Sequence, residues 1–269
     1  MASAPIAIVT GASRGIGAAT ALELARRGYG VTLVARDPDA LAEATRAVQQ
    51  CGADALTLAG DLADLQFAES VVGTTMERWG RIDVLVNNAA WREVATMRTL
   101  SIESWERTVR ICLTTPAFMA RWTAVHMEAR GSGVIVNISS MMSQAASGFS
   151  PAYVACKGAM DSLTYELAAL YGPAGIRVVA VNPGAIDTAM SRGLSEDDVQ
   201  ADEDVRRFSE DMIMLRRWGT SEEIARAIAW VASEEASYLT GTTITLDGGW
   251  LHHHFPHSLK KKQFPDQFH

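Results

Sequence analysis

The sequence contains few cysteines and no long apolar segment, and each absence excludes a class of protein. Only Cys51, Cys112 and Cys156 occur among the 269 residues, and none forms a Cys-x-x-Cys pair. Neither a disulfide framework nor a zinc site is expected, and no metal ligands are predicted. No apolar run approaches the ~20 residues that cross a bilayer, and no basic segment precedes an apolar one at the start. We therefore expect a cytoplasmic protein with reduced thiols.

The chain also lacks an excess of basic residues. It has 24 Lys and Arg against 31 Asp and Glu, a formal net charge of −7. An acidic chain without a basic stripe argues against nucleic acid and against an anionic membrane surface as partners. The hydrophobic fraction of 48% and the charged fraction of 20% are typical of a globular protein with an ordinary core.

Seven short apolar segments, rich in β-branched residues, lie at 6–10, 30–35, 55–60, 82–87, 133–139, 176–182 and 242–248. They do not alternate strictly between polar and apolar residues, which is typical of parallel strands buried on both faces. Amphipathic stretches at 18–28, 38–52 and 65–80 lie between them. This alternation predicts the α/β class: a single Rossmann-like domain over 1–250, whose doubly wound, seven-stranded parallel sheet has helices on both faces.

Two regions depart from this pattern. Residues 188–217 follow the sixth apolar segment and contain a dense acidic run, and such long excursions are often mobile substrate lids. Residues 251–269 form a C-terminal tail rich in His, Lys and Phe. Its three consecutive histidines are predicted to be solvated rather than to bind a metal.

The first apolar segment runs into the glycine-rich sequence TGASRGIG at 10–17. Gly11, Gly15 and Gly17 fall between a predicted strand and a predicted helix. There, glycine lets the backbone approach a phosphate, and the helix N-terminus offers free N–H groups. A lone glycine triad is a weak signal, but its place in the chain makes it stronger. The spacing Gly-x3-Gly-x-Gly differs from the usual dinucleotide fingerprint.

A tyrosine and a lysine lie one helical turn apart in SPAYVACKGA at 150–159. In a helix, Tyr153 and Lys157 share a face. A free phenol holds its proton too tightly for exchange near neutral pH, and a nearby ammonium stabilises the phenolate. Each residue alone is more often packing or surface, so the pair depends on the motifs around it.

The glycine turn is followed in order by NNAA (87–90), NISS (137–140), YVACK (153–157) and NPGAIDT (182–188). Over about residues 5–250 these motifs resemble the classical short-chain dehydrogenase/reductase family. The resemblance implies hydride transfer between a nicotinamide cofactor and a carbonyl or secondary alcohol. It implies Ser140, Tyr153 and Lys157 as catalytic residues: Ser140 orients the substrate oxygen, Tyr153 is the acid or base, and Lys157 assists Tyr153 and binds the ribose. Ser139 is the second choice for the serine.

The resemblance also indicates the cofactor site. An acid at the end of the second strand favours NAD(H), but our alignment places Ala35 there, followed by Arg36. Arg36 and Arg14 could clamp a 2′-phosphate, which favours NADP(H). Asp37 argues the other way, because a register slip of two would place an acid beside the ribose. The implied cofactor-binding residues, of which Asn87 could equally brace neighbouring strands, are Gly11, Ser13, Arg14, Gly15, Ile16, Gly17, Arg36, Asp61, Leu62, Asn87, Ala89, Tyr153, Lys157, Pro183, Gly184, Ile186 and Thr188.

The expected substrate is a small, moderately hydrophobic molecule, because the candidate pocket residues are apolar and flexible. Methionines at such positions are as often plain packing, and Arg92 or Arg192 could bind an anionic substrate instead. The family's usual association surfaces are the helices at 103–128 and 152–172 and the end LTGTTITLDGGW, which implies a homotetramer or, next, a homodimer. The predicted substrate-binding residues are Trp91, Met141, Met142, Gln144, Phe149 and Met190.

One position departs from the family pattern. The family commonly places an asparagine seven residues after the tryptophan of the helix at 103–122, and counting from Trp105 gives Cys112. That asparagine supports a water between the lysine and solvent, which a thiol does poorly. Three interpretations stay open: a weakened or rerouted relay, a small buried hydrophobe, or a catalytically idle cofactor- or ligand-binding protein. A reactive Cys112 would need a lowered pKa. An NAD-dependent dehydrogenase of the same family is the other alternative.

Overall fold

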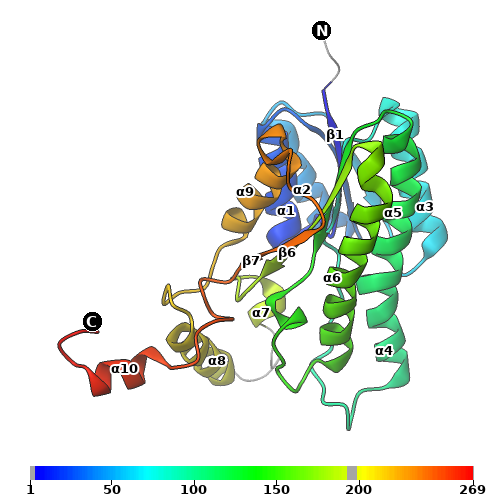
Figure 1. Ribbon diagram of the computed structural model, residues 1–269. Helices are drawn as coiled ribbons and strands as arrows, with labels where there is room; N and C mark the ends of the chain where they lie inside the picture. The colour runs from blue at the N-terminus through cyan, green and yellow to red at the C-terminus, as the bar shows by residue number, and fades with distance from the viewer. Residues whose placement is uncertain (1–3, 193–198, 269) are drawn as a thin grey trace.

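The computed structural model describes residues 4–192 and 199–268 (Figure 1). One parallel sheet has the strand order β3-β2-β1-β4-β5-β6-β7. Its strands agree with the seven predicted apolar segments to within two residues at each end, which confirms the doubly wound sheet. They are β1 (Ile6–Thr10), β2 (Gly30–Ala35), β3 (Ala55–Ala59), β4 (Val84–Asn87), β5 (Gly133–Ile138), β6 (Ile176–Pro183) and β7 (Thr242–Leu246).

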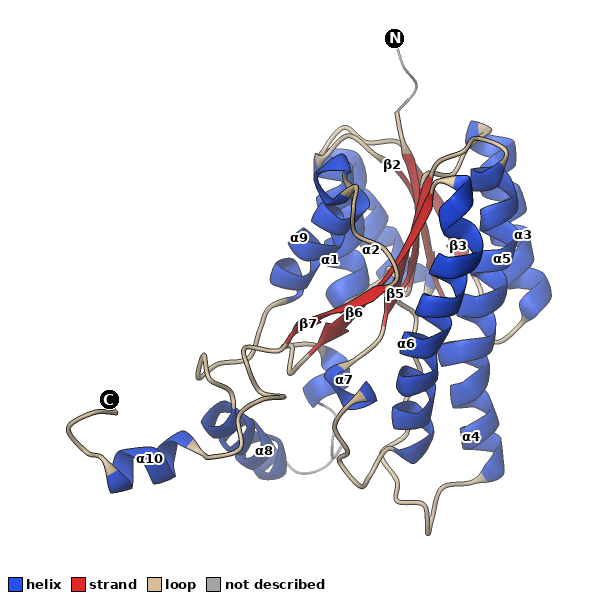
Figure 2. Ribbon diagram, in the orientation of Figure 1, coloured by secondary structure: helices blue, strands red, loops and turns tan. Residues whose placement is uncertain are grey.

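Helices cover both faces of the sheet (Figure 2). One face carries α1 (Gly15–Arg26), α2 (Pro38–Gln50) and α9 (Ser221–Ala232). The other carries α3 (Leu65–Trp79), α4 (Ile102–Val109), α5 (Thr115–Glu128) and α6 (Pro151–Tyr171). Beyond the carboxyl edge lie α7 (Ala189–Arg192), α8 (Val199–Met212) and α10 (His257–Gln263). Within the described ranges, no helix combines the length and apolarity that a membrane crossing requires.

Successive residues of the strands point into two separate cores. Ala7 and Val9 of β1 belong to the core beneath α1 and α9, whereas Ile8 between them belongs to the core beneath α3, α5 and α6. All three are fully buried. Because both faces of the sheet are covered, both sets of side chains must be apolar, which explains the missing polar–apolar alternation.

The helix expected over 103–128 is interrupted by a π-helical turn, η1 (Arg110–Thr114), between α4 and α5. Pro116 has no N–H, so the carbonyl of Cys112 cannot receive an ordinary i to i+4 bond there. The N–H of Thr115 instead donates to the carbonyl of Arg110, five residues back. Such turns often occur at functional sites, and this one holds Cys112 and directs Ile111 to the cavity described below.

Candidate active site

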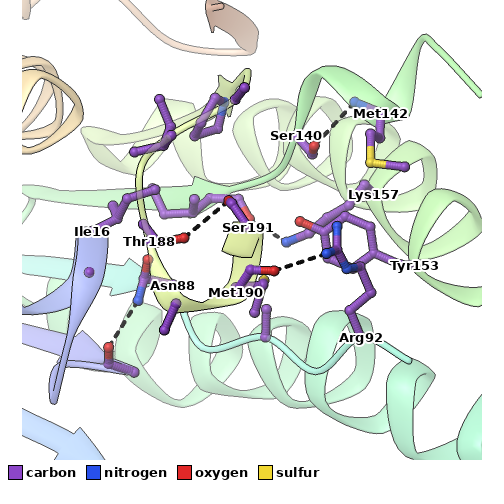
Figure 3. Close-up of a pocket in the computed structure, with 18 of the residues that line it drawn as sticks. Ile16, Asn88, Arg92, Ser140, Met142, Tyr153, Lys157, Thr188, Met190 and Ser191 are labelled. Atoms are coloured by element: carbon purple, nitrogen blue, oxygen red, sulfur yellow. Dashed lines mark hydrogen bonds between the residues drawn. The ribbon is translucent and has the colours of Figure 1, made fainter. Parts of the chain in front are cut away.

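A cavity of about 1030 Å³ lies at the carboxyl edge of the sheet, where the strand order reverses between β1 and β4. This switch point is where open α/β sheets bind ligands. Figure 3 shows Tyr153 and Lys157 on one side of the cavity, with Ile16 and Thr188 across from them. The cavity therefore joins the predicted catalytic residues to the glycine turn.

Helix α6 brings Tyr153 and Lys157 to the cavity on one face. The ammonium nitrogen of Lys157 lies 5.2 Å from the centroid of the Tyr153 ring and donates to the carbonyl of Ile138 at 2.6 Å. Lys157 is 2% exposed. An ammonium has three N–H donors, so two remain for a ligand. Pro151, in the first turn of α6, fixes the backbone just before this pair.

Ser139 and Ser140 follow directly after β5 and make different hydrogen bonds. The Ser139 hydroxyl donates to the carbonyl of Lys157 at 3.0 Å, so its proton is committed to packing. The Ser140 oxygen accepts from the N–H of Met142 at 3.1 Å. Its own proton therefore stays available to a ligand in the cavity, which favours Ser140 as the substrate-orienting serine.

The glycine turn forms the floor of the cavity, and its backbone requires glycine at positions 11, 15 and 17. Gly11 and Gly15 have φ of +65° and +57°, a region that other residues rarely adopt. A Cβ on Gly17 would overlap the carbonyl oxygen of Gly11 and the amide nitrogen of Asn88. At the start of α1, the Arg14 side chain makes no capping hydrogen bond, so the first N–H groups of the helix are free. This arrangement fits a pyrophosphate.

Two consecutive asparagines, the last residue of β4 and the one after it, have different roles. Asn87 donates to the side chain of Asn137 at 3.0 Å and to the carbonyl of Pro116 at 3.3 Å, so it braces β4 against β5 and α5. Asn88 lines the cavity and donates to the carbonyls of Thr10 and Gly11 at 2.8 and 3.2 Å. The second asparagine thus fixes the glycine turn.

The carboxyl end of β2 presents Arg36 and Asp37 to the cavity. Asp37 is the N-cap of α2, and its carboxylate accepts from the N–H groups of Asp39 and Ala40 at 3.0 and 3.2 Å. The Arg36 guanidinium lies 5.5 Å from the centroid of the Trp91 ring. One oxygen of Asp37 therefore caps α2, whereas Arg36 places a positive charge on the cavity wall.

Close to Arg36, the Asp61 carboxylate forms an ion pair with Arg107 at 2.8 Å. Burial raises the pKa of the Asp61 carboxyl, but hydrogen bonds from the backbone of Ala63 and from Arg107 outweigh it and hold the pKa below its ordinary value. The Arg107 guanidinium also lies 5.0 Å from the Trp91 ring centroid. Trp91 therefore lies beneath Arg36 and Arg107 instead of on the wall where a substrate contact was predicted.

The segment after β6 closes the cavity over the glycine turn. A Cβ on Gly184 would lie 2.6 Å from the Cα of Asp247, so the segment passes tightly against the strand end. A Cβ placed on Gly15 would lie 3.3 Å from the methyl group of Thr188. The hydroxyls of Thr188 and Ser191 are 3.2 Å apart. These contacts hold Thr188 above the cavity floor.

Cys112 does not line the cavity and is 1% exposed. Its sulfur accepts from the N–H of Trp91 and donates to the Trp91 carbonyl, both at 3.3 Å. Burial raises the pKa of the Cys112 thiol despite the opposing charge of Lys157. Burial raises the pKa of the neighbouring Cys156 to about 12. Cys112 is therefore a buried protonated thiol and not a reactive thiolate.

The far wall is supplied by α7, α8 and Trp250, and the tail at 251–269 packs behind α8. The tail was expected to be solvated, yet Ser258 donates through its N–H and its hydroxyl to the Asp211 carboxylate of α8, at 2.9 and 2.6 Å. His253 is 8% exposed, contacts the carbonyl of Met212 through Nδ1 at 2.6 Å, and contacts Lys260 through Nε2. The tail is thus fastened to the end of the predicted lid, of which residues 193–198 lie outside the described ranges.

All the predicted site residues line the cavity except Gly17, Asn87, Trp91 and Gln144. Gln144 instead ends the short turn after Ser140. The side chain of Arg192 lies outside the part of the chain that the structure describes. Arg92, which the sequence offered as an alternative ligand for an anionic substrate, also lines the cavity. Lining residues that the sequence did not indicate include Asn88, Ile111, Val205, Phe208, Met212, Trp218 and Trp250. Asn88 lies within the NNAA motif, whereas the others carry no local signal.

Comparisons with known proteins agree with this geometry. A family model described as enoyl-(acyl carrier protein) reductase matches residues 11–251. The cis-4-hydroxycyclohexanecarboxylate dehydrogenase of Sinomonas cyclohexanicum is 38% identical over 248 residues, 91% of this chain and 96% of that protein. Glucose 1-dehydrogenase 2 of Bacillus subtilis is 34% identical over 246 residues, 90% and 93% of the two chains.

A solved structure extends the comparison to three dimensions. L-sorbose reductase from Gluconobacter frateurii, complexed with NADPH and L-sorbose, matches with a TM-score of 0.87 at 30% identity. The match covers 93% of this chain and 97% of the reductase. The chain therefore belongs to the short-chain dehydrogenase/reductase family, a group of nicotinamide-dependent oxidoreductases that act on alcohol and ketone groups.

Proposed function

We propose that this enzyme is an NADP(H)-dependent oxidoreductase acting on a moderately hydrophobic ketone or secondary alcohol. The observation that carries the proposal is the convergence of Ser140, Tyr153 and Lys157 in one cavity with the glycine turn. A bound nicotinamide supplies or accepts the hydride. The remaining work, orientation of the substrate and movement of one proton, falls to the side chains.

Each of the three side chains has one task. Ser140 donates its hydroxyl proton in a hydrogen bond to the substrate oxygen, because the bond from the N–H of Met142 uses its oxygen as an acceptor and leaves the proton available. Tyr153 gives its phenolic proton to that oxygen during ketone reduction, or removes it during alcohol oxidation. Lys157 stabilises the phenolate by its charge and keeps two N–H donors for the ribose hydroxyls.

The end of β2 supports NADP(H) over NAD(H). NAD(H) would require a carboxylate turned toward the ribose, whereas the Asp37 carboxylate is held at the start of α2 by the two bonds that its Oδ1 accepts there. Arg36 faces the cavity as a cation and Arg14 begins α1, so both suit a 2′-phosphate. The related sorbose reductase was solved with NADPH. The other residues proposed to contact the cofactor are those of the set expected from the sequence, except Asn87, which braces β4.

The far wall supports a moderately hydrophobic substrate. It is lined mainly by apolar side chains from the segment after β5, from α7 and α8, and from the residue just before the tail: Met141, Met142, Phe149, Met190, Phe208 and Trp250. Such a wall suits an aliphatic or ring-containing frame better than a phosphorylated sugar. The relative from Sinomonas cyclohexanicum is named for a ring alcohol with an apolar frame.

Apolar side chains on α4, α5 and α6 support a homotetramer or homodimer. Ile102, Phe118, Val125 and Leu170 are 78, 37, 59 and 61% exposed on these neighbouring helices. Exposed apolar patches often mark association surfaces. Sedimentation velocity measures the assembly directly, and a monomer at micromolar concentration would contradict this part of the proposal.

The function is tested by replacing Tyr153 with phenylalanine. Loss of a positioned acid or base should lower kcat by about 10³-fold, whereas the dissociation constant of NADPH should change little. Tyr238→Phe is the matched control, because Tyr238 is fully exposed and far from the cavity wall. Retention of full turnover by Tyr153→Phe would overturn the assignment.

A further inference from the structure

Arg92 is a cation beside the reacting groups that the proposed mechanism does not use. It lies in the loop after β4 and lines the cavity. Its guanidinium carbon is 6.0 Å from the centroid of the Tyr153 ring. Figure 3 shows the side chain reaching toward Tyr153, with Met190 of α7 beside it. A small substrate whose oxygen meets Tyr153 therefore lies within reach of this charge.

The charge of Arg92 is not compensated within the described residues. One guanidinium nitrogen donates to the carbonyl of Met190 at 2.9 Å, and no described carboxylate forms an ion pair with Arg92. The acids on the described cavity wall are Asp37, whose Oδ1 caps α2, and Asp61, which pairs with Arg107, and neither forms an ion pair with Arg92. A guanidinium has five N–H donors, so four remain free.

The wall near Arg92 offers little else to a charged ligand. The side chains supplied by the turn after β5 and by α8 are mostly apolar, and they include Met141, Met142, Phe149, Val205, Phe208 and Met212. Where apolar walls displace water, a guanidinium attracts an anion more strongly than it does in bulk solvent. A neutral substrate would bury part of Arg92 without a partner, whereas an anionic substrate supplies one.

From this geometry we propose that Arg92 determines specificity by binding a carboxylate of the substrate, which makes that substrate a hydroxy acid or oxo acid with an apolar frame. The inference rests on the proposed function, because it places the carboxylate relative to the carbonyl that Tyr153 protonates. The planar guanidinium receives both carboxylate oxygens side by side while it keeps its bond to Met190. Through Arg92, substrate binding is thereby linked to α7, at the start of the predicted lid.

The test compares two ketones that differ only in charge, 4-oxocyclohexanecarboxylate and its methyl ester, with NADPH as reductant. We expect the wild type to favour the acid over the ester by about 30-fold in kcat/KM, and Arg92→Gln to bring this ratio close to one. Arg92→Lys should keep part of the preference for the acid, because lysine retains the positive charge but cannot bind both carboxylate oxygens with one planar group. Arg98→Gln is the matched control, because Arg98 is exposed on the same loop and absent from the cavity wall.

A second measurement separates this inference from the proposed function. Calorimetry with the non-reacting cyclohexanecarboxylate, in the presence of NADP, should show binding to the wild type and to Arg98→Gln that Arg92→Gln weakens at least about tenfold. Failure to reduce either ketone would count against the proposed function, and Arg92-dependent carboxylate binding would still support the inference. An acid-to-ester ratio or a carboxylate affinity that Arg92→Gln leaves unchanged would overturn the inference.

Discussion

The floor and the far wall of the cavity are built by different means. The floor is main chain: positive-φ glycines, free N–H groups at the start of α1, and the Asn88 amide bonded to two carbonyls. The far wall is side chain, with partly exposed apolar residues such as Phe208, which is 64% exposed. A backbone floor admits one residue type at each position and suits a constant ligand, whereas a side-chain wall tolerates exchange and suits a variable one.

The largest effect should come from a methyl group added to the floor. Gly17→Ala places a Cβ against the Gly11 carbonyl, which the turn can relieve only by shifting. Overpacking of this kind costs about 1–3 kcal/mol, so NADPH affinity should fall by up to about 100-fold. Fluorescence titration with NADPH measures this loss.

The matched control is the same substitution where space is open. Gly73 lies inside α3, and a Cβ there meets nothing within 4 Å. Gly73→Ala should leave NADPH affinity unchanged and raise the free energy of unfolding by about 0.5–1 kcal/mol, because alanine is the better helix former. If Gly17→Ala bound NADPH as tightly as Gly73→Ala, the floor would not depend on close backbone packing.

A smaller and different effect is expected at the far wall. Asp211→Ala removes the acceptor for the two hydrogen bonds from Ser258, which fasten the tail to α8, together with the ion pair to Arg216. The loss of about 1 kcal/mol should raise the substrate KM by about fivefold and leave NADPH affinity unchanged. Ser258→Ala removes only the hydroxyl bond, because its backbone N–H still donates, so it should give a smaller change, and the double variant should add little to Asp211→Ala.

The control for this prediction is Glu77→Gln, an exposed acid on α3. Steady-state kinetics of all four variants under one set of conditions give KM and kcat separately. An equal loss of NADPH affinity in Asp211→Ala would mean that the two sides of the cavity are not independent, and the comparison between floor and wall would fail.

The sequence predicted the sheet well because both cores impose a simple rule: successive residues of strands such as β1 are mostly apolar on both faces. It predicted the floor well because glycine is required there. It did not distinguish Asn88 from Asn87. The two are adjacent, and the alternation of side chains along the strand determines which of them faces the cavity.

Features that depend on long-range contacts were not predictable from local pattern. Trp91 packs beneath Arg36 and Arg107, from distant parts of the chain. The tail docks on α8 through Asp211, about 47 residues before Ser258 in sequence. Neither contact has a recognisable sequence motif. The residues alone therefore suggested a substrate contact for Trp91 and a solvated tail.

The smallest effect is expected at Cys112, which belongs to neither side of the cavity. Cys112→Asn should change kcat by less than about threefold, or ~0.7 kcal/mol, because among the described residues the thiol hydrogen-bonds only to the backbone of Trp91 and does not line the cavity. Stopped-flow measurement of NADPH oxidation tests this directly. A large gain in rate would show that the wild-type proton relay is impaired at this position.

The most direct test of the central claim is a titration of the protein with NADPH and NADH, followed by nicotinamide fluorescence. If Arg36 and Arg14 face the 2′-phosphate while Asp37 caps α2, NADPH should bind at least about tenfold more tightly, and Arg36→Ala should remove most of that difference. Tighter binding of NADH would contradict the account of the β2 end. Binding of neither nucleotide would contradict the assignment of the cavity as a cofactor site.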